Sequence, residues 1–356
     1  MINFSEEYDR KNFLLFLKQF LPGDLLENNE ELQIDEGNEY FKRATLLGSI
    51  KSLENLVVIE VERKRSEKSR ITITKELFKF LDTYGYSKAL VVTFSEKESH
   101  YRFSLIKSDL NWISETKVKK EFSNPKRLSF LLGKNQKIHT ANSQLVKLGK
   151  VKSLDDLHSR FQIEIVNKEF FDNYKNLFEN LSKNLQTDKV FIKFLKKMSI
   201  DVDLFAKKLL GQLIFCYFLQ KKGWLLDGQN IKFGNGENNF LRKKFLEYEN
   251  KNKNFYNKFL EYFFYEGLNQ KNENNYLEII NCKIPYIGGG LFEYYDGYDW
   301  KKENLNIPNH LFSNKKNNGI FDIFDLYNFT VDENETMDIE IAVDPEMLGR
   351  VFENLL

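Results

Sequence analysis

A short stretch near residue 60 carries the residues with the clearest potential for chemistry. It reads LVVIEVERK from Leu56 to Lys64, so an apolar run leads directly into two glutamates and a lysine. Side chains alternate between the two faces of an extended strand, and Glu60, Glu62 and Lys64 therefore share one face. Mg²⁺ prefers carboxylate oxygens, and a nearby ammonium can orient or deprotonate a metal-bound water. The pattern indicates metal-assisted hydrolysis of a phosphodiester.

The spacing from Glu62 to Lys64 is the E-x-K half of a PD-(D/E)xK nuclease site. We expect Glu62 and Lys64 to be catalytic, with Glu60 as a supplementary ligand. Such a site needs one more acidic ligand, and the candidates are Glu54, beside Asn55, and Glu39, on an expected helical stretch before the strand. The E-x-K spacing also arises by chance, so a solvated strand edge with surface ion pairs is the alternative interpretation.

Basic residues follow the acidic pair and could hold DNA phosphates near it. A second basic pair lies within SNPKRLSFLLG. The predicted DNA-binding residues are Arg63, Arg65, Lys68, Arg70, Lys126 and Arg127. The other lysine runs lie on amphipathic segments and are typical of solvated helix faces.

The elements that would position these residues form two units. Residues 1–152 alternate helical and strand patterns, which predicts an α/β domain with a mixed sheet flanked by helices. The helix at 13–20 ends at Pro22-Gly23, and a second helical face follows the strand at 56–62. From residue 153 to 356 the apolar residues recur three and four apart, which predicts a mostly helical second unit.

The composition excludes several classes of protein. The 356 residues are 42% hydrophobic and 29% charged, as in a globular chain, and 53 basic residues balance 52 acidic ones. Two cysteines and no signal-peptide pattern predict a cytoplasmic protein, and no apolar run reaches the ~20 residues that span a bilayer. The four histidines lack partners at metal-ligand spacing, which argues against zinc.

The chain resembles the N-terminal part of bacterial type IIG-like restriction-modification enzymes. These single polypeptides join a nuclease-like domain, a helical connector, an adenine-N6 DNA methyltransferase and a target-recognition domain. The resemblance covers most of the chain from Ala44 to Leu356. It is carried, in order, by IEVERK, YRFSLI, SNPKRLSFLLG, LLGQLIFCYFLQKKGWL, IPYIGGGLFE and NFTVDENETMDIEIAVDPEMLGRVFENLL.

The resemblance implies a Mg²⁺-dependent endonuclease-like domain that acts on double-stranded DNA in phage defence. It also implies that the methyltransferase, with its S-adenosylmethionine site, lies beyond Leu356. Gly288-Gly289-Gly290 matches a turn of the connector and is not a cofactor loop, because such a loop should follow a strand and open a helix. The acidic position upstream of the strand departs from the family pattern, since Glu54 or Asn55 stands there.

Two alternatives come from other functional classes. The first is a catalytically inactive DNA-binding and scaffolding module of a protein that only methylates DNA. The lack of an aspartate at the acidic position upstream of the strand favours it. The second is a protein-interaction domain, which rests on the aromatic residues of IPYIGGGLFEYYDGYDW.

Overall fold

The computed structural model describes residues 2–64, 70–112, 120–303, 305–331 and 337–353. The chain divides into two compact units. Unit 1 comprises Met1–Val166, Leu326–Asn328 and Asp332–Val343, and unit 2 comprises Asn167–Asp325, Phe329–Val331 and Asp344–Leu356. This division differs from the expected boundary at residues 152 and 153, and two late segments return to unit 1.

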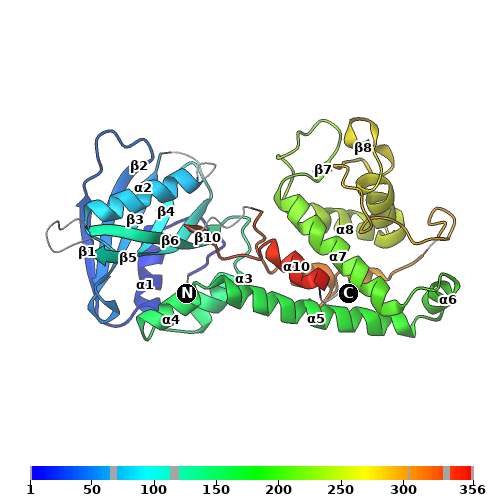
Figure 1. Ribbon diagram of the computed structural model, residues 1–356, viewed down its shortest axis with the longest axis horizontal. Helices are drawn as coiled ribbons and strands as arrows, with labels where there is room; N and C mark the ends of the chain where they lie inside the picture. The colour runs from blue at the N-terminus through cyan, green and yellow to red at the C-terminus, as the bar shows by residue number, and fades with distance from the viewer. Residues whose placement is uncertain (1, 65–69, 113–119, 304, 332–336, 354–356) are drawn as a thin grey trace. The chain divides into compact units, whose positions relative to one another are not determined.

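Unit 1 is built on a mixed seven-stranded sheet in the order β1-β2-β3-β4-β5-β6-β10 (Figure 1). The β3–β4 and β6–β10 pairs are parallel and the other pairs are antiparallel. The predicted α/β unit with a mixed sheet flanked by helices is thus confirmed. The strands are β1 (Leu25–Leu32), β2 (Phe41–Ile50), β3 (Leu56–Arg63), β4 (Lys88–Phe94), β5 (His100–Trp112), β6 (Lys120–Gly133) and β10 (Asp338–Glu340).

Helices α1 (Arg10–Phe20) and α2 (Arg70–Thr83) cover opposite faces of this sheet. Along β3, Val57, Ile59 and Val61 belong to the same buried cluster as the inner residues of α2. On the other face, the aromatic side chains of α1 surround Phe103 of β5, which lies opposite Val92 of β4. The alternation of β3 therefore turns Glu60 and Glu62 toward the α1 side.

One expectation about the edge of the sheet was wrong, and one strand was missed. The expected helical stretch at 39–41 is a bend that leads into β2, and strand β1 lies between it and α1, where the sequence carries no strand signal. β1 has the sequence LLENNEEL, whose polar residues do not alternate with apolar ones because this strand lies at the edge and is exposed on both faces.

The chain from residue 153 onward is mostly helical, as predicted. In unit 2 the 20-residue helix α7 is buried on nearly all sides, and a small sheet has the order β7-β9-β8. Among the described residues, no helix is long and apolar enough to cross a membrane. The helices are α3 (His139–Ala141), α4 (Leu154–Arg160), α5 (Ile163–Thr187), α6 (Lys189–Lys197), α7 (Val202–Lys221), α8 (Phe240–Asn250), α9 (Ile320–Phe324) and α10 (Glu346–Glu353), and the short strands are β7 (Leu226–Asp227), β8 (Tyr276–Leu277) and β9 (Cys282–Lys283).

Candidate functional site

Glu60 and Glu62 lie on β3 between β2 and β4, and both side chains are buried. Glu60 is 2% exposed and Glu62 is 4% exposed. A solvated strand edge is therefore the wrong description of this pair. Because a buried carboxylate is costly unless it is paired, the partners of each glutamate decide what it can do.

Both carboxylate oxygens of Glu60 are engaged by residues near the start of the chain. The Tyr8 hydroxyl donates to Oε1 over 2.5 Å, and Nη2 of Arg10 lies 3.3 Å from Oε2. Burial, followed by the charge of Glu60, raises the pKa of Tyr8 far above its ordinary value, so Tyr8 stays a hydrogen-bond donor. The Tyr8 ring also packs on Phe94 with a centroid distance of 4.5 Å, which fixes it over the end of β4.

Glu62 is neutralised by two consecutive cations of β2. Nζ of Lys42 lies 2.5 Å from Oε1, and Nη2 of Arg43 lies 3.5 Å from Oε2. The register of β2 against β3 shifts between Phe41 and Arg43, where these two side chains reach the same glutamate. Lys42 also lies 3.4 Å from the exposed Glu96, and its hydrogen bond to Glu62 is the largest cause of its raised pKa.

Lys64 does not join the glutamates. Its Nζ donates to the Asn38 carbonyl over 2.8 Å, and its backbone N–H donates to the Tyr40 carbonyl over 2.7 Å. In the part of the chain that the structure describes, no ion pair links Lys64 to Glu60 or Glu62. The expected catalytic pairing of Glu62 with Lys64 is thus replaced by the pairing of Glu62 with Lys42 and Arg43.

The two candidates for a further metal ligand lie elsewhere. Glu54 is in the turn before β3 and pairs with Lys88. Five residues separate it from Glu60, and the strand alone rises roughly 13 Å from Leu56 to Glu60. Glu39 is exposed in the bend before β2. No group of three or more His, Cys, Asp or Glu within the described ranges is placed to hold a metal ion. The predicted set of Glu39, Glu54, Glu60 and Glu62 is not assembled.

Two of the predicted DNA-binding arginines, Arg63 and Arg127, are buried on the α2 face of the sheet, and Arg70 of α2 is partly buried, which corrects the expectation of a surface cluster. Arg63 pairs with Glu98 over 2.8 Å, and Arg70 pairs with Asp338 over 2.7 Å. Arg127 is 1% exposed, and its guanidinium donates to the hydroxyls of Thr74, Thr93 and Ser104. Lys126 is exposed, as the prediction requires, and Arg65 and Lys68 lie outside the described residues.

The sequence reasoning missed the network to which these arginines belong. The arginine network consists of Arg70, Arg102, Arg127, Asp338 and Glu340. Glu340 lies 2.8 Å from Arg102 and 3.2 Å from Arg70, and β10 pairs with β6 so that Asp338 stands beside Arg127. The one feature of the sequence that could have indicated the network is the tripeptide DIE at 338–340, in which two acidic residues flank an apolar one. The partners of these acids lie more than 200 positions earlier in the chain, so only the fold brings them together.

The comparisons with known proteins add no assignment. No protein-family model, curated protein or solved structure matches this chain. The chemistry of the site must therefore be argued from the geometry given above and from the sequence resemblance.

Proposed function

We propose that this chain is a non-catalytic DNA-binding and scaffolding module, the N-terminal part of an adenine-specific DNA methyltransferase of the type IIG-like class. The observation that supports it is the state of the acidic pair. The four oxygens of Glu60 and Glu62 face Tyr8, Arg10, Lys42 and Arg43, which already supply the cations and donors that these carboxylates need.

This donor set does not fit Mg²⁺ as it stands. A hard divalent ion requires several free oxygen ligands around it at about 2.0–2.1 Å. Here each carboxylate has a guanidinium or ammonium partner, and positive groups would repel a second cation in the same space. The residues that a nuclease would use for a metal thus serve to hold α1 and β2 against β3.

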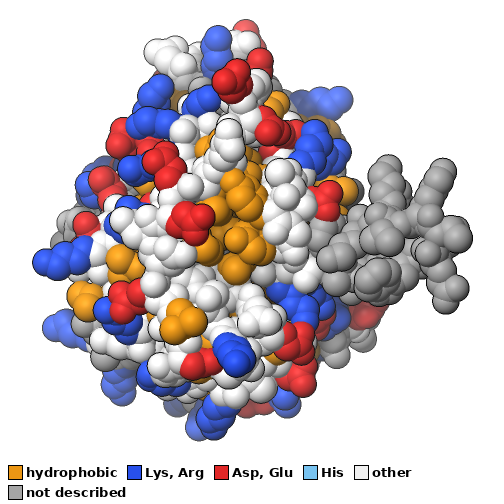
Figure 2. Space-filling model, turned by 90° about the vertical axis from the view of Figure 1, so that its left-hand side faces the viewer, with side chains coloured by type: hydrophobic (Ala, Val, Ile, Leu, Met, Phe, Trp, Pro, Cys, Tyr) orange, Lys and Arg blue, Asp and Glu red, His pale blue; other side chains and the backbone are white. Residues whose placement is uncertain are grey.

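The same cations give the site a way to bind DNA. Arg10, Lys42 and Arg43 balance the three carboxylates of Glu60, Glu62 and Glu96, so the group has no net charge. The side chains of Lys42 and Arg43 are 53% and 46% exposed, and they can reach phosphates while their inner contacts hold them in place. The face drawn in Figure 2 intersperses charges of both signs around an apolar strip, so its coloured residues form no broad basic field.

A Mg²⁺-dependent endonuclease is the second candidate function, and one observation favours it. Lys42 contacts both Glu62 and Glu96, so a shift of this half-exposed side chain would leave two carboxylates near each other and close to Glu60. In that arrangement Lys42, from β2, would take the role expected for Lys64. The two candidates therefore differ in whether Mg²⁺ displaces Lys42.

Metal titration separates the two functions. We expect that Mg²⁺ and Mn²⁺ leave the melting temperature unchanged and that the protein does not cleave unmodified double-stranded DNA, because the described residues offer no free set of carboxylates. Glu62→Gln serves as the metal-ligand variant and Glu31→Gln, on the exposed edge strand, as its control. A melting shift and DNA cleavage that both disappear in Glu62→Gln would establish the endonuclease instead.

DNA binding is tested separately by fluorescence anisotropy with a labelled duplex at several salt concentrations. We expect Lys42→Ala to weaken binding at low salt and to reduce the slope of log K against log salt by about 0.9, the value for one lost phosphate contact. Lys79→Ala, on the exposed side of α2, is the matched control. If the unmodified chain does not bind the duplex, the proposal of a DNA-binding module is refuted.

The link to methylation is tested by reading the gene beyond Leu356 for a methyltransferase signature.

A further inference from the structure

Helix α6 of unit 2 has more apolar surface than its own packing uses. Its sequence KVFIKFLKK buries Phe191 and Leu195 against the rest of the unit. Val190 and Phe194 are four residues apart and form a second apolar stripe, in which Val190 is 80% exposed and Phe194 is half-buried. Val190 is the most exposed of the large apolar side chains among the described residues, and with Phe194 it presents a continuous apolar surface on α6.

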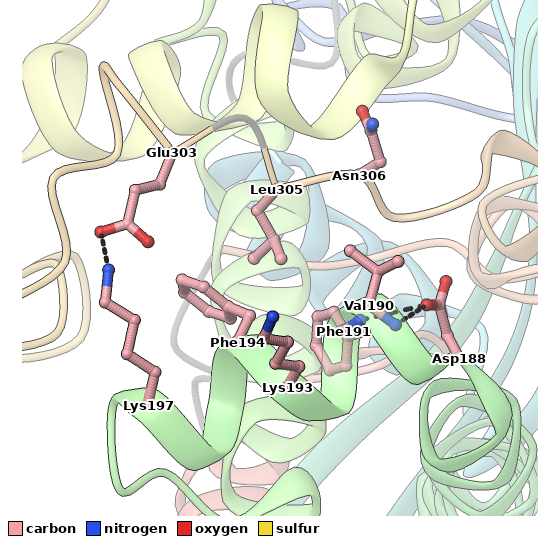
Figure 3. A pocket seen from close by; sticks show the side chains of 9 residues that line it. All are labelled: Asp188, Val190, Phe191, Lys193, Phe194, Lys197, Glu303, Leu305 and Asn306. Atoms are coloured by element: carbon pink, nitrogen blue, oxygen red, sulfur yellow. Dashed lines mark hydrogen bonds and ion pairs between the residues drawn. The ribbon is translucent and has the colours of Figure 1, made fainter.

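The second stripe forms one wall of a pocket (Figure 3). The pocket has a volume of about 620 Å³, and Leu305 lies across from Val190, Phe191 and Phe194. This volume is within the roughly 300–1,000 Å³ range of pockets that enclose an organic ligand. It also has room for a bulky apolar side chain of a bound segment.

The polar groups around the pocket are satisfied, with one exception. Asp188 accepts from the backbone N–H groups of Val190 and Phe191 and so caps the helix, and Glu303 pairs with Lys197 over 2.9 Å. Lys193 projects between Phe191 and Phe194 in Figure 3, and it forms no hydrogen bond or ion pair with any residue in the described ranges. An apolar pocket with one unpaired ammonium is complementary to an apolar group that carries a negative charge.

A second lysine of α6 extends this complementarity beyond a single carboxylate. Lys189 and Lys193 are four residues apart on one side of the helix, about 6 Å along its axis, and both are exposed, whereas Lys197 already pairs with Glu303. A small organic acid would meet only one of these ammonium groups. A peptide segment with several acidic residues can meet both while one apolar side chain enters the pocket.

We infer that the α6 pocket binds an acidic peptide segment that carries a bulky apolar residue. The apolar side chain lies against Val190, Phe194 and Leu305, and a neighbouring carboxylate pairs with Lys193. Nucleic acid is a poorer fit, because phosphates would pair with the lysines but would leave the apolar walls exposed. The site is in unit 2 and is independent of the acidic pair on β3.

The test uses the whole chain and a fluorescein-labelled peptide of sequence Asp-Glu-Leu-Phe-Asp-Glu, followed by fluorescence anisotropy. We expect saturable binding that weakens with salt. Val190→Asp and Lys193→Glu should each raise the dissociation constant at least about tenfold, because each places a negative charge against the acidic segment. Both side chains are exposed, so the variants should fold, which circular dichroism checks.

The matched controls are Ile279→Asp and Lys232→Glu, which change exposed residues of unit 2 that do not line the pocket. They should bind the peptide as the unmodified chain does. Equal affinity for the peptide with Asn and Gln in place of its acids would overturn the proposal, as would unchanged binding by Val190→Asp. Binding of decanoate, but not of the peptide, would overturn it in favour of a small-acid site.

Discussion

Replacing Glu340 with alanine is expected to destabilise unit 1 by about 3–5 kcal/mol, the cost of leaving a buried charge without its partner. Glu340 is 3% exposed and lies between the guanidinium groups of Arg102 and Arg70. Removal of the carboxylate takes this partner from the buried Arg102, where water cannot readily replace the lost contact, whereas Arg70 keeps Asp338. The strand that carries Glu340 is the last one in the sheet order, so its loss also exposes β6.

Urea denaturation followed by circular dichroism measures this effect, with Glu96→Ala as the control. Glu96 also pairs with a cation, but its side chain is 71% exposed, and such pairs contribute only about 0–1 kcal/mol. The double variant Arg102→Leu with Glu340→Leu should recover part of the loss, since apolar residues can replace a buried pair. Equal stability of Glu340→Ala and Glu96→Ala would show that the arginine network does not hold β10.

The sheet was predictable because the core strands carry strong local signals. Val57, Ile59 and Val61 alternate with polar residues at the end of β3, and α2 places Leu77 and Leu81 on one face. Both patterns are set by residues a few positions apart. β1 escaped prediction because an edge strand that is exposed on both faces has no such alternation.

The site was only partly predictable, since strand geometry fixes the face on which a side chain lies but not its partners. The alternation of β3 gave the shared face of Glu60 and Glu62. It could not show that Tyr8, Arg10, Lys42 and Arg43 would occupy their oxygens, because these residues come from other elements. The arginines at 63, 70 and 127 were read as surface groups for the same reason, although buried acids and hydroxyls surround them.

Glu261 in unit 2 is a buried carboxyl group whose environment has a large energetic consequence. It is 1% exposed, and the Tyr298 hydroxyl donates to its Oε1. Burial raises its pKa to about 8, and the hydrogen bond from Tyr298 and the charge of Lys258 offset only part of that shift. Tyr256 and Tyr265 also lie close by, with their hydroxyls 3.4 Å apart.

Unit 2 should therefore lose stability as the pH rises from about 4.5 to about 8. Between these values the folded protein keeps a proton on Glu261 that the unfolded chain, with the ordinary pKa of 4.5, has released. Stability is fully present below pH 4.5 and falls as the pH rises through 8. The total loss from this group is roughly 3–5 kcal/mol, at about 1.4 kcal/mol for each unit of difference in pKa.

Urea denaturation monitored by tryptophan fluorescence follows this dependence at a series of pH values, since two of the three tryptophans lie in unit 2 and the ring of Trp300 is 5.6 Å from that of Tyr265. Glu261→Gln keeps a hydrogen-bond partner for Tyr298 but cannot ionise. We expect its stability to match that of the unmodified protein near pH 5 and to exceed it above pH 8. Other titrating groups are common to both proteins, so the difference between their pH profiles isolates Glu261. The control variant Glu249→Gln, which changes an exposed residue, should have the same pH profile as the unmodified protein. Parallel pH profiles for Glu261→Gln and the unmodified protein would mean that Glu261 is ionised in the folded state at neutral pH.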